Sequence, residues 1–147
     1  MLVFTKEINY SPSVTEDDVS REIELQDRAS AYDFTPNIIE SVFDDDKCTI
    51  TMEHLEEVCL AEKYGKDPKD IPEWIWDEIR DILSILYDEE GIEYIDITPY
   101  NFIEKDGKVH IIDFGHAYYK NDESKMNWFL RDFFDGVNEW NPDFYTQ

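Results

Sequence analysis

The sequence contains little cysteine, little glycine and no long apolar run, and each shortage excludes a class of protein. Two cysteines among 147 residues, Cys48 and Cys59, give neither a disulfide framework nor the ligand spacing of a zinc site. The five glycines form no G-x-G phosphate-binding loop anywhere. No apolar stretch is long enough to span a membrane, and the opening MLVFTKEINY is too short and too charged to predict a secretory signal.

Basic residues are also scarce, and the resulting charge narrows the possible partners. There are 13 Lys and Arg against 36 Asp and Glu, which gives a formal net charge of −23. Such a field repels phosphate backbones and anionic lipids, so we expect neither nucleic acid nor a membrane surface as a partner. It favours a protein partner or substrate with a basic surface, although the charge could also serve solubility alone. The sequence does not predict an oligomeric state.

The chain has enough apolar material for a folded core. Hydrophobic residues make up 41% of the sequence and aromatic residues 15%. This composition argues against global disorder, and the length fits one domain. Two reduced cysteines are typical of a cytoplasmic protein.

Periodicity and breaking residues predict the elements of the first third. We expect a strand over residues 2–5, and a helix from Thr15 to about residue 31 with acidic residues in its first turn. Residues 38–43 and 48–52 read as two strands around an acidic turn, which predicts a hairpin.

The rest of the chain is predicted to be mostly helical. We expect a short helix over residues 55–64, the longest helix over residues 73–89 with a C-cap at Gly91, and a last helix over residues 124–134. Two strands, residues 101–103 and 109–112, should flank a turn. The order of elements predicts an α+β fold with its helical part late.

Three polar residues in the second half have the spacing and chemistry of a phosphoryl-transfer site. Asp96 follows the longest helix, Asn101 comes five residues later, and Asp113 comes twelve residues after Asn101, directly after an apolar strand. A hairpin between Asn101 and Asp113 can bring both side chains to one ion. Mg²⁺ prefers carboxylate and amide oxygens, and a further carboxylate can orient an attacking hydroxyl group and accept its proton.

The segment YIDITPYN at residues 94–101 resembles the protein-kinase catalytic loop H-R-D-L-x-x-x-N, and Asp113-Phe114-Gly115 is similar to the metal-binding D-F-G motif. The resemblance implies a minimal protein-kinase-like fold, with a small partial N-lobe sheet, an αC helix and a reduced helical C-lobe. Residues 1–147 would form one truncated domain, divided into an N-lobe at about 1–54 and a C-lobe at 55–147. It also implies ATP and Mg²⁺ as cofactors, Asp96 as the base, and Asn101 and Asp113 as metal ligands.

The resemblance extends upstream. Residues 3–6 are similar to the kinase strand that carries the phosphate-contacting lysine, so Lys6 is the candidate, although it could be an ordinary solvated lysine. Glu22 would be the helix glutamate that pairs with this lysine, with Glu24 as its rival.

Residues 51–55 resemble the strand and hinge that hold adenine. Met52 would then be the gatekeeper, or else plain core, and the backbone groups of Glu53 and Leu55 would face the base.

The sequence also departs from the kinase pattern. We expect no glycine-rich loop ahead of Lys6, and the 32 residues after Gly115 contain no A-P-E motif and leave little room for a peptide-binding platform. Tyr94 and Ile95 stand where the catalytic loop usually has His and Arg, and Thr98 stands where many Ser/Thr kinases have Lys.

Two features near the end of the chain are less specific. His116, directly after the D-F-G motif, could touch phosphate, act in proton transfer or simply cap the next turn. The residues expected to hold the last segment against the core are Trp140, Asn141, Pro142 and Phe144.

Three functions therefore stay open. One is an active minimal Ser/Thr-type protein kinase, with Asp96 as base and a Lys6–Glu22 pair. The second is a pseudokinase or adaptor that binds and regulates a host kinase or another protein without catalysis. The third is a small-molecule kinase resembling aminoglycoside or choline phosphotransferases. Compact proteins of this kind are typical of viruses and bacterial effectors, which would imply the host cytoplasm.

Overall fold

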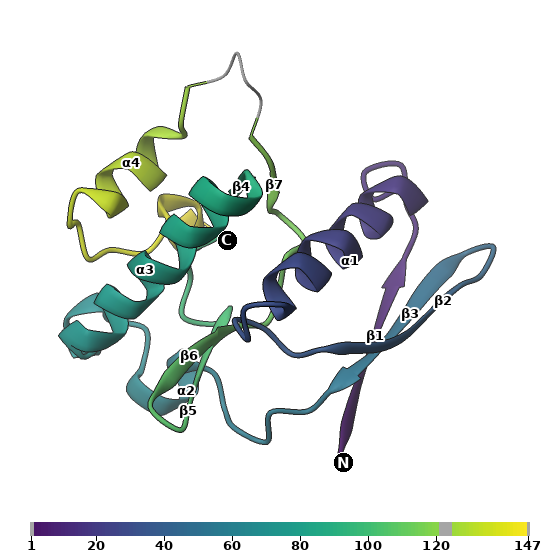
Figure 1. Cartoon of the computed structure of the whole chain (residues 1–147), viewed down its shortest axis with the longest axis horizontal. Coiled ribbons are helices and arrows are strands. Elements are labelled where there is room, and N and C mark those ends of the chain that lie inside the picture. The colour runs from purple at the N-terminus through teal and green to yellow at the C-terminus, as the bar shows by residue number, and fades with distance from the viewer. Residues whose placement is uncertain (1, 121–124, 147) are drawn as a thin grey trace.

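A three-stranded antiparallel sheet forms the first part of the chain (Figure 1) in the computed structural model, which describes residues 2–120 and 125–146. The strands β1 (Val3–Asn9), β2 (Ile38–Phe43) and β3 (Lys47–Glu53) lie in the order β1-β3-β2. The predicted β2–β3 hairpin is confirmed. The first strand is longer than predicted, because it pairs with β3 over its whole length, from Val3 opposite Glu53 to Asn9 opposite Lys47.

Helix α1 (Glu16–Ser30) covers one face of this sheet. It begins where predicted, because the side chain of Thr15 accepts a hydrogen bond from Asp18 N–H and the carboxylate of Asp18 accepts one from Thr15 N–H. A small core is buried between the helix and the sheet, formed by Val19, Cys48, Ile50 and Met52.

The second part of the chain is built around helix α3 (Glu73–Glu90). Its apolar residues at helical spacing are buried: Ile75, Ile79, Ile82, Leu83 and Leu86, together with Trp76. The short helices α2 (Leu60–Tyr64) and α4 (Trp128–Phe134) also contribute buried residues to this larger core. Gly91 ends α3 in the left-handed conformation, with φ of 68°, so the predicted C-cap is confirmed.

The predicted second hairpin is present as β5 (Phe102–Lys105) and β6 (Lys108–Ile111). Its turn uses Asp106 and Gly107, which have φ of 54° and 76°. A further pair, β4 (Ile92–Glu93) and β7 (Tyr118–Tyr119), was not predicted, because two-residue strands leave no periodic pattern.

Two predicted helices are shorter than expected. Residues 55–59 are not helical: Glu56 has a positive φ of 62°, and Cys59 forms an isolated bridge to Ile103. The last helix begins at Trp128, where Asn127 accepts hydrogen bonds at its N-terminus. The predicted start at Ser124 lies outside the described residues.

The last residues fold back onto the helical core. Trp140 is fully buried, and a short 3-10 helix (Pro142–Thr146) follows it; another (Pro68–Asp70) precedes α3. Across the described ranges 2–120 and 125–146, no helix combines the length and apolarity that crossing a membrane requires.

Helix α3 should control the stability of the whole domain. Ile79 is fully buried, whereas Ile85 on the same helix is 36% exposed. We expect Ile79→Ala to lower the free energy of unfolding by about 2–5 kcal/mol through lost burial and a residual cavity. Ile85→Ala should cost about 1 kcal/mol or less. Urea unfolding of both variants measures this, and equal losses would contradict the assignment of the core.

Candidate active site

Lys6 on β1, Glu22 on α1 and Asp113 after β6 form one charged cluster. Lys6 Nζ lies 2.7 Å from Glu22 Oε2 and 3.6 Å from Asp113 Oδ1. Of the two candidate glutamates it is Glu22 that faces the lysine. Glu24 accepts hydrogen bonds from Arg28 and Tyr119 at the surface instead.

The cluster keeps Lys6 charged. Burial alone would lower the pKa of Lys6, but the charges of Asp113 and Glu22 and the hydrogen bonds to them outweigh it, so the pKa lies above the ordinary 10.5. A cation is therefore present beside Asp113 throughout the physiological pH range.

Asn101 connects the catalytic-loop residue Asp96 to this cluster. Its Nδ2 donates to the backbone oxygen of Asp96 at 2.8 Å and to Asp96 Oδ2 at 2.9 Å. Its own backbone oxygen accepts a hydrogen bond from Ile112 N–H at 3.0 Å. Asn101 is therefore paired across the hairpin with the residue directly before Asp113. Among the described residues no hydrogen bond ends on Asn101 Oδ1, and this oxygen is available to a ligand.

Tyr94 contacts the D-F-G segment through both its hydroxyl group and its ring. Its hydroxyl group donates to the backbone oxygen of Asp113 at 2.6 Å, and its ring packs edge-on against Phe114 with centroids 5.5 Å apart. The side chain is buried, and burial raises the pKa of Tyr94 well above its ordinary value, so it stays a donor. The sequence showed Tyr94 only as a departure from the kinase pattern; its position before Ile95 and Asp96 was the available signal.

Gly115 lies close to two carboxylates. A Cβ atom here would lie 3.1 Å from Asp113 Oδ1 and 3.1 Å from Glu22 Oε1, so any side chain would crowd both carboxylates. The N–H group of Gly115 donates to Asp113 Oδ1 at 2.8 Å and fixes the orientation of that carboxylate.

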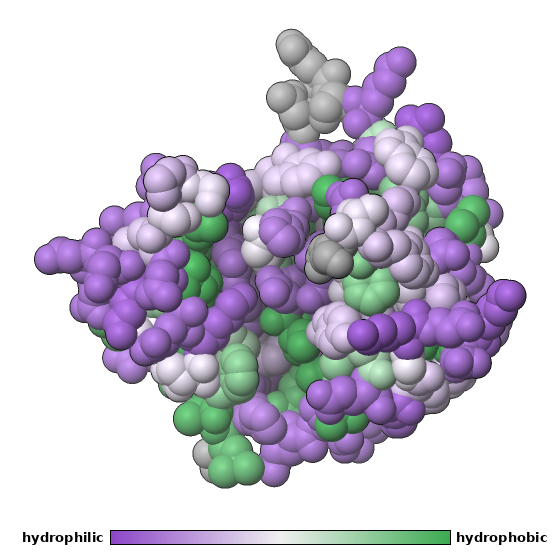
Figure 2. Space-filling model, turned by 180° about the vertical axis from the view of Figure 1, so that it is seen from behind, coloured by the Kyte–Doolittle hydropathy of each residue, from purple (hydrophilic) through white to green (hydrophobic). Residues whose placement is uncertain are grey.

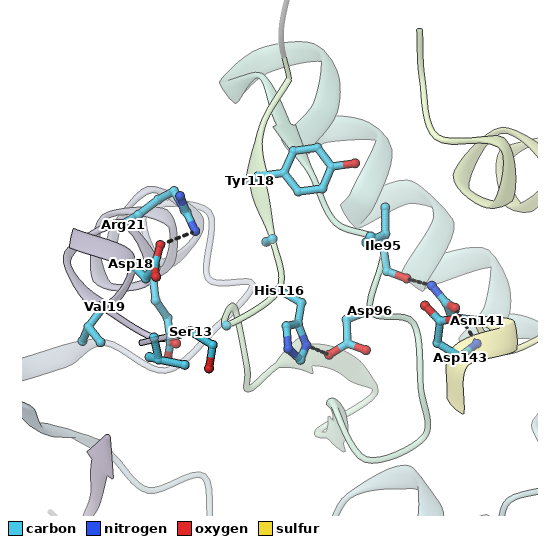
Figure 3. A pocket seen from close by; sticks show the side chains of 14 residues that line it. Ser13, Asp18, Val19, Arg21, Ile95, Asp96, His116, Tyr118, Asn141 and Asp143 are labelled. Carbon is cyan, nitrogen blue, oxygen red and sulfur yellow. Dashed lines mark hydrogen bonds and ion pairs between the residues drawn. The ribbon is translucent and has the colours of Figure 1, made fainter. Parts of the chain in front are cut away.

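His116 pairs with Asp96, an outcome that the sequence did not single out. Figure 3 shows the two side chains pointing toward each other, and His116 Nδ1 lies 3.1 Å from Asp96 Oδ2. The hydrogen bond to Asp96, helped by the negative charges of Asp96, Asp113 and Glu22, raises the pKa of His116 above 6.5 although partial burial opposes it.

A cavity of about 570 Å³ opens beside the cluster. Lys6, Asn101 and Asp113 line it together with the predicted hinge residues Met52, Glu53 and Leu55 and several apolar side chains, Phe4, Pro36, Ile103 and Ile112. On the face seen in Figure 2 the molecule is hollowed between its two halves, and apolar side chains gather in the hollow. An apolar slot with charged groups along its wall suits a nucleotide base and its phosphates.

The predicted hinge residues lie along this cavity. Met52 is only 4% exposed and belongs to the small core, and it also lines the cavity, so its role as gatekeeper stays a prediction. Glu53 N–H donates to the backbone oxygen of Asn37. In the described part of the chain, Leu55 N–H has no hydrogen-bond partner and is available to a ligand.

A second cavity, of about 620 Å³, lies on the other side of the cluster (Figure 3). Glu22, Asp96, Gly115 and His116 line it, as does Asn141 from the end of the chain. Asp96 thus faces a different space from the one lined by Lys6 and Asp113.

The donor set fits a metal that arrives with a nucleotide. Asn101 and Asp113 offer an amide and a carboxylate oxygen, the hard ligands that Mg²⁺ prefers. Within residues 2–120 and 125–146 there is no group of three or more His, Cys, Asp or Glu that could hold a metal alone. A Mg²⁺ ion bound to one or two protein ligands, waters and phosphates needs no such group.

This fold and this arrangement of charged groups are those of a kinase-like domain. The protein kinase domain family matches residues 1–135, which is most of the chain, and the protein belongs to that family. No curated protein sequence gives a significant match. The kinase-like, α+β fold predicted from the sequence is confirmed, and membership implies ATP and a divalent metal in general terms. The roles of the individual residues stay predictions.

Histidine titration tests the Asp96–His116 pair. Because its folded-state pKa is raised, His116 should titrate above 6.5, and the stability that the pair contributes is present at lower pH and is lost as pH rises through that pKa. His110, whose pKa is lowered by burial, should titrate below 6.5 in the same protein. NMR of the ring protons measures both, and Asp96→Asn should return only His116 toward 6.5. The reverse order of the two histidines would contradict the pairing.

Proposed function

We propose that this protein transfers the γ-phosphoryl group of ATP, with Mg²⁺, to a hydroxyl group, as a Ser/Thr-type protein kinase. The observation that carries this proposal is the connected cluster of Lys6, Glu22, Asp113, Asn101 and Asp96 between two cavities. Phosphoryl transfer needs a nucleotide on one side and an acceptor on the other, with charge stabilisation between them.

Each residue has one task in this mechanism. Lys6, held by Glu22, binds the phosphates and neutralises their charge. Asn101 Oδ1 and the carboxylate of Asp113 would hold Mg²⁺, which would supply positive charge beside the phosphates. Asp96 orients the acceptor hydroxyl group and accepts its proton. Among the described residues Asp96 Oδ1 carries no hydrogen bond, so one oxygen is available for this contact while Oδ2 is held by Asn101 and His116.

The adenine would bind at the hinge. Leu55 N–H and the backbone oxygen of Glu53 can pair with the edge of the base, while Met52 and Phe4 contact its apolar surface. Such a site recognises the base through backbone groups. Nucleotide affinity therefore depends less on the side chain of Glu53 than on the geometry of the strand.

For the acceptor we propose a protein with a basic surface. The net charge of −23 supports this, and so do the carboxylates Asp18 and Asp143, which line the second cavity with Asp96. Long-range attraction of this kind raises association rates and weakens with salt.

A second candidate function is a pseudokinase or adaptor that binds a partner without catalysis. Thr98 favours it: where many kinases have a lysine, its hydroxyl group is buried and accepts from Tyr100 N–H, so it adds no cation to the site. The absence of any G-x-G in the sequence favours it as well. Nucleotide binding and transfer, measured separately, distinguish the two functions.

Binding of Mg-ATP is the first test. We expect Mg-ATP at a hundred times its dissociation constant to stabilise the protein by about 2.7 kcal/mol, seen as a higher melting temperature. Lys6→Met should weaken binding at least about tenfold, because phosphate charge is then unopposed. Lys47→Met is the matched control, since Lys47 lies on β3 of the same sheet and pairs only with exposed Glu7. Equal affinity in both variants by calorimetry would remove Lys6 from the site.

Phosphate transfer is the second test. Variants of two carboxylates distinguish nucleotide binding from the transfer step. Asp113→Asn should weaken Mg-ATP binding and abolish transfer, because a metal ligand is lost. Asp96→Asn should keep Mg-ATP binding and lower kcat by about 10²–10⁴-fold, because only the base is lost. Labelled ATP with a basic acceptor protein measures this. Mg-ATP binding without any transfer by the unmodified protein, to itself or to the acceptor, would favour the adaptor.

A further inference from the structure

The end of the chain, residues 138–146, contacts the catalytic loop although it lies outside the matched family region, which ends at residue 135. Trp140 anchors this C-terminal segment. Its ring is fully buried 4.5 Å from the ring of Trp76, and its Nε1 donates to the backbone oxygen of Lys66 at 2.8 Å. The next residue, Asn141, is thereby brought to the backbone on either side of Asp96.

Asp96 is the middle residue of a tight turn. The N–H group of Ile97 donates to the backbone oxygen of Ile95 at 2.8 Å, which closes a three-residue turn. One hydrogen bond closes this turn, and Asn101 holds the backbone oxygen of Asp96 itself. The direction of the Asp96 side chain also depends on what holds Ile95 and Ile97, the residues before and after it.

Asn141 forms hydrogen bonds to the backbone oxygens of both of these residues. Its Nδ2 donates to the oxygen of Ile95 at 2.6 Å, and its backbone N–H donates to the oxygen of Ile97 at 2.8 Å (Figure 3 shows the first of these contacts). The two carbonyl groups that flank Asp96 therefore share one partner residue. Asn141 is only 8% exposed, so water competes little for these bonds.

The asparagine is itself held in place. Its Oδ1 accepts from Asp143 N–H at 2.9 Å and its backbone oxygen accepts from Phe144 N–H at 2.9 Å, which forms the start of the last 3-10 helix. The ring of Phe144 lies 5.9 Å from that of Tyr100, between Asp96 and Asn101 in the sequence. The amide of Asn141 thus reaches the loop from a rigid position.

Other residues already attach the C-terminal segment to the core, so the bonds of Asn141 to the loop are not needed for that purpose. Asn138 already ties the segment to α3, since it accepts from Arg80 at 2.6 Å and donates to Glu73 at 3.2 Å. The buried ring of Trp140 also attaches the segment to the core. The bonds of Asn141 are the ones directed at the catalytic loop.

We propose that Asn141 is a positioning residue, which orients the carboxylate of Asp96 between Asn101 and His116 by fixing the backbone oxygens of Ile95 and Ile97, the residues on either side of it. This inference rests on the proposed function for its catalytic consequence. The orientation itself can be measured without any turnover.

Two variants test it. Asn141→Ser removes the amide that donates to Ile95, while the serine hydroxyl group can still accept from Asp143 N–H and keep the 3-10 start. Asn138→Ala is the control, because it loosens the same segment without touching residues 95–97. For each we would measure kcat, KM for ATP, the urea midpoint and, by NMR, the pKa of His116.

If Asn141 positions Asp96, Asn141→Ser lowers kcat by about tenfold or more with KM for ATP unchanged, and the pKa of His116 falls toward 6.5 as Asp96 leaves the ring. Asn138→Ala leaves kcat and the His116 pKa unchanged even if its urea midpoint falls equally. Equal effects of the two variants, or no effect of Asn141→Ser on the His116 pKa, would overturn the proposal.

Failure of the proposed function looks different. The unmodified protein would then transfer no phosphate, while the His116 pKa still responds to Asn141→Ser and not to Asn138→Ala. Should Asn141→Ser fail to fold, Asn141→Gln, which keeps an amide donor on a longer arm, replaces it: the proposal then requires a partial shift of the His116 pKa in the same direction, and an unshifted value overturns it.

Discussion

The contact of Lys6 with Glu22 and Asp113 is the constraint on which the rest of the site depends, because it joins three parts of the chain at one point. The lysine comes from the edge strand β1, Glu22 from the helix on the sheet, and Asp113 from the end of the second hairpin. Lys6 lies between the two carboxylates, so this contact ties the strand, the helix and the end of the hairpin together. The cavity between the sheet and the helical part is formed around this contact.

The segment around Asp96 shows how a small kinase-like domain can orient a carboxylate with few residues. From one side Tyr94 holds the backbone of Asp113, and Asn101 holds both the backbone and the side chain of Asp96. From the other side Asn141 holds the backbone oxygens of Ile95 and Ile97, the residues next to Asp96. These donors are at most 8% exposed, and a buried donor competes with little water, so a short network can orient a carboxylate.

Local signals predicted most of the elements. The helix start at Thr15, the C-cap at Gly91 and the turn of the second hairpin depend on residues close to them in the chain, so sequence alone identified them. The length of β1 and the non-helical segment 55–59 depend on partners elsewhere, on β3 in the first case and on the bridge to Ile103 in the second. No local pattern could reveal those partners.

The sequence by itself determined the family: the spacing of Asp96, Asn101 and Asp113 predicted a kinase-like domain, and the family match confirms it. Only the tertiary structure decided that Glu22 rather than Glu24 faces Lys6, that His116 pairs with Asp96, and that the end of the chain holds the catalytic loop. These contacts join residues 16 to 46 positions apart. Sequence spacing says nothing about distance over such separations, since it is the packing of the two cores that brings the residues together.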